Sequence, residues 1–280
     1  MVGVLRQCLG LLRDRPYGRK QPLILINGLA EQAESWFRNR RYWERFFDVK
    51  VPEFLVYGGP MLQRRIDEGK PITVDYFTDQ LELFLDGFVQ RPPYHLVASS
   101  LGGQIAVEYA VRYPERVSRM VLLCPSGMGG EERLPILDGV RHNNFEALVG
   151  SVFYHRKFIN PGLVRHYERQ FASREWRKAV LRTVRGTSEH CVRDKLPRVT
   201  APTLVICGRE DKVVDSLQVL EAIKGLPNFR CVMIRRCGHA PQIERARLVN
   251  RLVRHFLTHP QPETEPRFAS LLEPTQVPAQ

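Results

Sequence analysis

The sequence contains no long apolar run and no paired cysteines. Its uninterrupted apolar stretches are far shorter than the roughly 20 residues that a transmembrane helix needs. No two cysteines have the C-x-x-C spacing typical of a zinc site, and their scatter is unlike a disulfide framework. The six are Cys8, Cys124, Cys191, Cys207, Cys231 and Cys237. We expect no metal site and predict that the cysteines pack as small apolar residues.

Lysine is scarce, although the net charge is +12. Only eight of the 42 basic residues are lysines, and the arginines are spread over the whole chain. Nucleic-acid binding typically needs a clustered basic stripe, so we expect no nucleic-acid partner.

The first 20 residues carry apolar side chains at helical spacing from Leu5 to Leu12. This spacing predicts a short amphipathic helix that docks on the protein's own core, with a basic membrane-surface helix as the alternative. Arg6 and Arg13 interrupt the apolar residues, and no small-residue cleavage site follows. We therefore expect no signal peptide and a cytoplasmic location.

The length of 280 residues and the 43% hydrophobic content suit one α/β domain with an insertion. Four largely apolar runs are typical of buried parallel strands, and the first of them is uninterrupted: Pro22–Ile26, Val117–Leu123, Thr203–Cys207 and Arg230–Ile234. From residue 128 to residue 198 the pattern is helical and rich in aromatics. We predict an N-terminal helix (1–20), a core (21–127 and 199–259), a helical insertion (128–198) and a disordered tail (260–280).

A sharp strand-to-helix turn at Ala98-Ser99-Ser100-Leu101-Gly102 carries the candidate nucleophile. A serine on such a corner has a strained backbone, and the residues two before and two after it must be small. Ala98 and Gly102 meet this requirement for Ser100. Ser99 would need Val97 and Leu101 in those places, where branched side chains collide. The alternative is an ordinary turn with a helix-capping serine.

The stretch YHLVASSLGGQIA resembles the nucleophile elbow of the α/β-hydrolase superfamily, with Ala98 in place of the usual first glycine. The resemblance covers about residues 20 to 258 and implies a mostly parallel central sheet flanked by helices. The helical insertion at 128–198 then corresponds to the superfamily's cap, which lies over the elbow and shapes the substrate pocket.

Two later loops resemble the remaining catalytic loops of that superfamily. Gly208-Arg209-Glu210-Asp211 follows an apolar strand and resembles the acid loop, which makes Asp211 the candidate carboxylate. Gly238-His239-Ala240-Pro241 follows the last strand and resembles the histidine loop. The chain order Ser100, Asp211, His239 is the order that this superfamily uses.

The resemblance also implies an oxyanion hole built from backbone N–H groups. Leu101 follows the nucleophile, and Leu29 follows the first core strand in Asn27-Gly28-Leu29. Asn27 stands where relatives commonly have histidine. A simple turn after the strand is the alternative for this loop.

The implied function is a serine hydrolase that cleaves a small to medium apolar acyl ester through an acyl-enzyme, without metal or organic cofactor. The acid and histidine loops resemble carboxylesterases and meta-cleavage product hydrolases, which break C–C bonds. Many members of the second group carry an aromatic residue after the catalytic histidine, where this chain has Ala240. C–C hydrolysis and a non-catalytic binding module are the alternatives. The expected partner is a small-molecule substrate.

Overall fold

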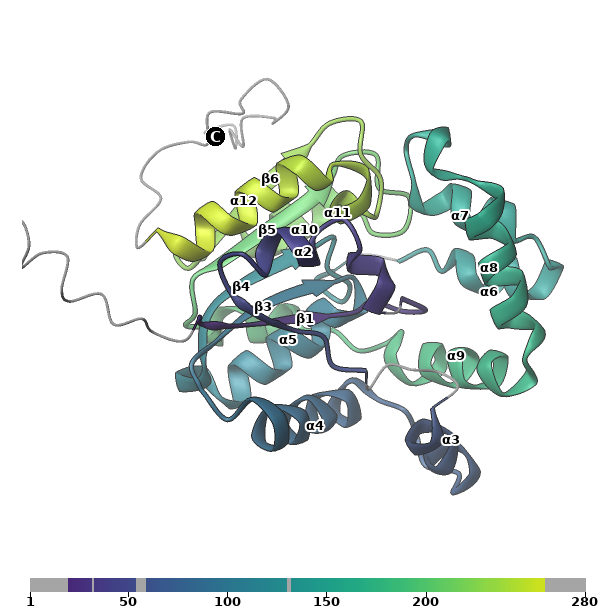
Figure 1. Cartoon of the computed structure of the whole chain (residues 1–280), viewed down its shortest axis with the longest axis horizontal. Helices are drawn as coiled ribbons and strands as arrows, with labels where there is room; N and C mark the ends of the chain where they lie inside the picture. Colours follow the sequence, from purple (N-terminus) through teal and green to yellow (C-terminus); the bar gives the residue numbers. More distant parts are fainter. Residues whose placement is uncertain (1–19, 32, 54–58, 130–131, 260–280) are drawn as a thin grey trace, which may run out of the picture.

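The computed structural model describes residues 20–31, 33–53, 59–129 and 132–259. One six-stranded sheet with the order β2-β1-β3-β4-β5-β6 forms its centre (Figure 1). The strands are β1 (Pro22–Ile26), β2 (Asp48–Lys50), β3 (Tyr94–Ser99), β4 (Val117–Leu123), β5 (Thr203–Gly208) and β6 (Phe229–Ile234). All neighbouring strands pair in parallel. The predicted α/β class with a parallel central sheet is confirmed.

The strands are apolar on both faces because helices cover both faces. In β1, Ile24 and Ile26 belong to one core cluster, whereas Leu23 and Leu25 belong to the other. All four side chains are fully buried. Successive strand residues point to opposite faces, so burial on two sides requires a continuous apolar run.

Helices of the two faces are well separated in Figure 1, with α12 on one side and α4 and α5 on the other. The first face is covered by α2 (Arg40–Trp43) and α12 (Ala246–Thr258). The second is covered by α4 (Val74–Phe84), η2 (Leu85–Val89), α5 (Leu101–Arg112) and α10 (Ser216–Ile223). Shorter elements are η1 (Ala33–Trp36), α3 (Pro60–Asp67), η3 (Pro114–Arg116) and α11 (Pro241–Glu244).

The described residues between β4 and β5 form helices and the loops that join them, and Figure 1 shows these helices grouped beside the sheet. It contains α6 (Pro135–His142), α7 (Phe145–Val152), η4 (Arg156–Phe158), α8 (Pro161–Ala172), α9 (Arg174–Thr187) and η5 (Arg193–Arg198). Phe171 packs between Phe145 and Trp176, with ring centroids 5.4 Å and 4.4 Å away. These aromatic residues hold the inserted helices to one another.

The predicted N-terminal helix and C-terminal tail lie outside the described residues, apart from residue 20. Within the described part of the chain, no helix has both the length and the apolar character needed to cross a bilayer.

A buried carboxylate ties α5 to the segment that returns from the inserted helices. The Glu108 side chain is 4% exposed and accepts hydrogen bonds from His190 Nε2 at 2.7 Å and from Lys195 Nζ. Burial alone would raise the pKa of Glu108, but these two partners hold it at about 2. These two contacts fix the position of α5, the helix that begins directly after Ser100.

We expect Glu108→Gln to lower the free energy of unfolding at pH 7 by on the order of 2 kcal/mol. Because the folded-state pKa lies below the unfolded value of 4.5, this contribution is complete above pH 4.5 and disappears as the pH falls toward 2. Urea unfolding at pH 7 and at about pH 3 measures the difference.

Glu115→Gln, at an exposed position, is the matched control and should leave stability unchanged at both pH values. An equal loss for Glu108→Gln at both pH values would contradict the electrostatic explanation.

Candidate active site

Ser100 lies at a strained corner between β3 and α5. Its backbone has φ 49° and ψ −117°, in the left-handed half of the map that side-chain-bearing residues rarely occupy. Such a conformation costs on the order of 1–3 kcal/mol and persists only where the surroundings enforce it. The Ser100 N–H donates to Leu123 O at 3.0 Å, which ties the corner to the end of β4.

The small residue two positions after Ser100 is required by the backbone of β1. A Cβ atom built on Gly102 would lie 2.6 Å from Ile26 O and 2.7 Å from Asn27 O. Both distances are shorter than real Cβ contacts, so α5 begins closer to β1 than any side chain allows.

Asp211 and His239 are brought together by the parallel pairing of β5 and β6. His239 Nδ1 lies 2.8 Å from Asp211 Oδ2. The Asp211 side chain is fully buried, and its Oδ1 accepts the N–H groups of Val213 and Val214 at 2.8 and 3.1 Å. The carboxylate is therefore fixed in orientation by three hydrogen-bond partners, as a buried charge requires.

The pKa values of this pair move in opposite directions. Burial alone would lower the pKa of His239, but the charge and hydrogen bond of Asp211 outweigh it and raise the pKa above 6.5. Burial alone would raise the pKa of Asp211, and the reciprocal interactions with His239 lower it instead. Glu31 and Glu132 add smaller charge effects that favour protonated His239.

Ser100 and His239 line the same cavity, which has a volume of about 540 Å³ and lies beneath the inserted helices. Ser100 is 8% exposed and His239 is 7% exposed. Since Nδ1 of His239 is engaged by Asp211, Nε2 is the nitrogen left to face the cavity. The structure thus brings the three predicted catalytic residues to one site.

Both predicted oxyanion residues also line this cavity. Leu101 is the first residue of α5, where backbone N–H groups have no partner within the helix. Leu29 lies in the loop after β1, and Gly28 before it approaches Ser100 so closely that an added Cβ would be 3.0 Å from Ser100 Cβ. Asn27, where relatives commonly have histidine, accepts the Trp36 indole N–H at 2.6 Å.

Glu31 is a site residue that the sequence did not reveal. Its carboxylate accepts the Gly28 N–H at 2.9 Å and the Ser99 hydroxyl at 2.9 Å. Burial raises the pKa of Glu31, and these hydrogen bonds oppose the effect. It therefore fixes the loop after β1 against β3. The only local feature of the sequence that indicates this role is the position of Glu31 three residues after Gly28.

Ser126 and Glu132 were also missed. Ser126 Oγ lies 3.2 Å from Ser100 Oγ, and both line the cavity. Glu132 accepts the Gly127 N–H at 2.5 Å and a hydrogen bond from Ser126. Burial raises the pKa of Glu132. Ser100, the candidate nucleophile, thus has a polar partner in the loop after β4.

Cys124 lies near Asp211 and His239, with ligand atoms of all three within 4.8 Å of one another. Among the described residues, these three side chains form the group whose donor atoms lie close enough together to hold a metal ion. The Cys124 Sγ accepts the Gly208 N–H at 3.4 Å, and burial raises the pKa of the thiol. A buried, protonated thiol beside an existing His–Asp hydrogen bond is a poor metal ligand.

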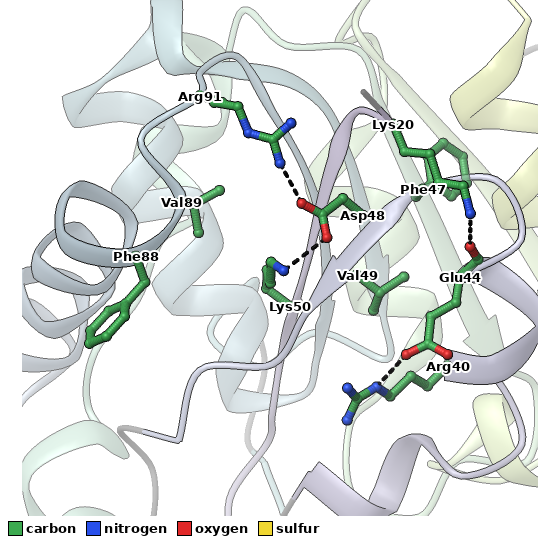
Figure 2. Close-up of a pocket in the computed structure, with 10 residues that line it drawn as sticks. All are labelled: Lys20, Arg40, Glu44, Phe47, Asp48, Val49, Lys50, Phe88, Val89 and Arg91. Atoms are coloured by element: carbon green, nitrogen blue, oxygen red, sulfur yellow. Dashed lines mark hydrogen bonds and ion pairs between the residues drawn. The ribbon is translucent and has the colours of Figure 1, made fainter. Parts of the chain in front are cut away.

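A second cavity, at the edge strand β2, is shown in Figure 2 and has a volume of about 650 Å³. Both of its carboxylates are paired with cations. Asp48 pairs with Arg91 and with Lys50, the latter at 2.9 Å, and Arg40 pairs with Glu44 at 2.8 Å. None of the ten lining side chains is a serine, a cysteine or a histidine, so we place the candidate site in the first cavity.

Comparison with known proteins points to one family. Residues 23–252 match the model of the alpha/beta hydrolase family. Human monoacylglycerol lipase ABHD6 is 24% identical over 271 residues, which span 88% of this chain and 77% of the human protein. A 2-hydroxy-6-oxononadienedioate/2-hydroxy-6-oxononatrienedioate hydrolase from Cupriavidus pinatubonensis is 29% identical over 178 residues, or 58% of this chain and 61% of that protein.

The solved structures include a similar fold. A meta-cleavage product hydrolase from Pseudomonas fluorescens IP01 superposes with a TM-score of 0.74 and 25% sequence identity. The match covers 86% of this chain and 91% of that one.

The contact between Gly102 and β1 predicts that Gly102→Ala is overpacked. We expect it to lose about 1–3 kcal/mol of unfolding free energy, because carbonyl oxygens of the sheet must move to admit the methyl group. Chemical denaturation measures the loss. Gly87→Ala is the control, since an added Cβ there meets nothing within 4 Å. Equal stabilities of the two variants would show that the close approach is wrong.

Proposed function

This chain is a member of the alpha/beta hydrolase family, and we propose that it is a serine hydrolase that cleaves carboxylic esters of small to medium apolar acyl groups. The observation that carries the proposal is that Ser100 and His239 line one cavity, while Asp211 forms a hydrogen bond with Nδ1 of His239. The proposed reaction uses no cofactor.

In the proposed acylation step, His239 Nε2 takes the proton from the Ser100 hydroxyl as Oγ bonds to the ester carbonyl carbon. The C=O electron pair moves onto oxygen. When the tetrahedral intermediate collapses, the alcohol leaves and receives the proton from His239. Asp211 keeps the proton of neutral His239 on Nδ1 and stabilises the imidazolium.

The negative oxygen of the intermediate is expected to meet the N–H groups of Leu29 and Leu101. Each well-placed donor contributes roughly 3–4 kcal/mol to the transition state. Water then attacks the acyl-enzyme, with His239 again as the base, and releases the carboxylic acid and Ser100.

The cavity lining supports an apolar acyl group. Its apolar side chains come largely from the inserted helices and include Ile136, Leu148, Val149, Phe153, Leu163 and Tyr167. Its volume of about 540 Å³ falls within the range of roughly 300–1,000 Å³ typical of small-molecule sites. The similarity to monoacylglycerol lipases also supports an apolar acyl ester.

C–C bond hydrolysis of the meta-cleavage type is the second candidate. The similarity to the hydrolases from Cupriavidus and Pseudomonas favours it. Ala240 favours the ester reaction, because its small, nearly buried side chain stands where many C–C hydrolases carry an aromatic ring.

A cytoplasmic location is also part of the proposal. Cys191 is exposed and unpaired, and Cys124, Cys207, Cys231 and Cys237 are also free thiols. A reducing compartment preserves such thiols.

The proposed role of His239 predicts the pH dependence of ester hydrolysis. Because only neutral His239 accepts a proton and its pKa is raised, kcat/KM should fall as the pH decreases, with a midpoint above 6.5. Asp211→Asn removes the main charge that raises this pKa, so the midpoint should move down and the rate should drop about 10⁴-fold. Glu31 and Glu132 remain in that variant and limit the shift. A midpoint that Asp211→Asn leaves unchanged would contradict the assignment.

Hydrolysis of p-nitrophenyl esters from acetate to long chains tests the substrate class. We expect the wild type to cleave short or medium esters and Ser100→Ala to lose about 10⁴-fold or more in kcat, because the nucleophile is absent. Ser188→Ala, which removes another cavity serine, should retain activity.

A fluorophosphonate probe separates the alternatives. Labelling of the wild type without ester turnover would favour the C–C reaction or another acyl substrate. Absence of labelling at Ser100 would favour a non-catalytic binding module and would contradict the proposed function.

A further inference from the structure

Two aromatic side chains from distant segments line the cavity, and one of them is highly exposed. Phe37, in the turn after η1, lines the cavity and is 69% exposed. Phe158, the last residue of η4, lines the same cavity from the inserted helical region. An exposed ring is common on a protein surface, but here it stands at the entrance to an apolar site.

Two basic side chains lie against the Phe158 ring. The Arg38 guanidinium lies 5.7 Å from the centre of the Phe158 ring, and Lys157 Nζ lies 5.3 Å from it. Arg38, Arg156 and Lys157 are all exposed. Arg38 also donates to Ile243 O at 2.9 Å, which fixes this segment to α11, next to the His239 loop. We call Phe37, Arg38, Arg156, Lys157 and Phe158 the rim patch.

The rim patch is positive as a whole. Glu34 is an exposed carboxylate that lines the same cavity, and the rim patch contains three exposed cations. Glu244, which also packs nearby, is buried and accepts the N–H groups of His155 and Gly238. The chain carries a net charge of +12, which adds a long-range attraction to negative surfaces.

The combination of aromatic rings and cations in the rim patch is complementary to the interface of an anionic lipid bilayer. Aromatic side chains settle at the level of the lipid headgroups, where one side of the ring is apolar and the other polar. Arginine and lysine near the surface are attracted by the negative headgroups. We propose that the rim patch docks this protein on the surface of an anionic bilayer, without spanning it.

Docking at the rim patch places the cavity opening against the lipid. An apolar ester then passes from the bilayer to Ser100 without crossing water. This consequence rests on the proposed function, whereas the docking itself does not require catalysis.

The test is cosedimentation of full-length Ser100→Ala protein with vesicles, so that no lipid is hydrolysed. Vesicles of phosphatidylcholine with about 30% phosphatidylglycerol are compared with phosphatidylcholine alone. We expect at least tenfold tighter binding to the anionic vesicles, weakened by 0.5 M salt, since screening reduces headgroup attraction.

Two variants in this background test the patch itself. Arg156→Glu with Lys157→Glu should weaken binding to anionic vesicles at least tenfold. Phe37→Ala should weaken it about fivefold, because the ring no longer enters the interface. Thermal unfolding checks that both variants remain folded.

Matched controls are available elsewhere on the surface. Phe88 is 79% exposed, and Figure 2 shows it near Lys50 at the edge cavity, outside the rim patch. Phe88→Ala should leave vesicle binding unchanged. Arg182→Glu with Arg185→Glu makes the same charge change on α9 and should have less than a threefold effect.

Equal binding to neutral and anionic vesicles would overturn the proposal. The same holds if the α9 variant loses as much binding as the rim variant, because the attraction would then follow net charge alone. Binding that Phe37→Ala leaves intact while DNA competes for it would indicate a general polyanion surface instead. Fluorophosphonate labelling of the parent protein tests catalysis separately.

Discussion

The close approach between the start of α5 and the end of β1 is the constraint on which the site depends. Gly102 leaves no room for a side chain against the carbonyl oxygens of Ile26 and Asn27. This contact turns the chain sharply at Ser100 and accounts for its left-handed backbone. It also brings the loop after β1, with Leu29, beside the nucleophile. Nucleophile and candidate oxyanion donors are therefore positioned by one packing contact rather than by flexible side chains.

The position of His239, the proposed catalytic base, depends on the inserted helices as well as on the sheet. The His239 N–H donates to Val152 O at 2.8 Å, at the end of α7. A Cβ atom on Gly238 would lie 2.5 Å from the same oxygen. Because α7 also lines the cavity, the segment that shapes the acyl pocket is the segment that holds the His239 loop. Substrate preference and base position are thus physically linked.

The family holds lipases and C–C hydrolases on one scaffold, so the reaction is decided by what surrounds the triad. In this chain those surroundings are an apolar lining, the small Ala240, and two half-buried carboxyl groups, Glu31 and Glu132. The opening combines Phe37 with exposed cations. The apolar cavity is complementary to an uncharged apolar ester, and the positive rim patch is complementary to a negative surface.

The sequence by itself determined the strands and the elbow, because their signals are local. Continuous apolar runs mark the buried strands, and the small residues at Ala98 and Gly102 single out Ser100 over Ser99. The order of Asp211 and His239 could be interpreted through the family resemblance. Their contact, however, exists only because β5 and β6 pair in parallel.

Other parts of the site were decided by the tertiary structure alone. Glu31 meets Ser99 across 68 residues, and Glu108 meets His190 across 82. The rim patch likewise joins Arg38 to Phe158. No local pattern encodes such partners, since each side chain is unremarkable in its own segment. These interactions form only when packing of the sheet and the inserted helices brings distant segments into contact.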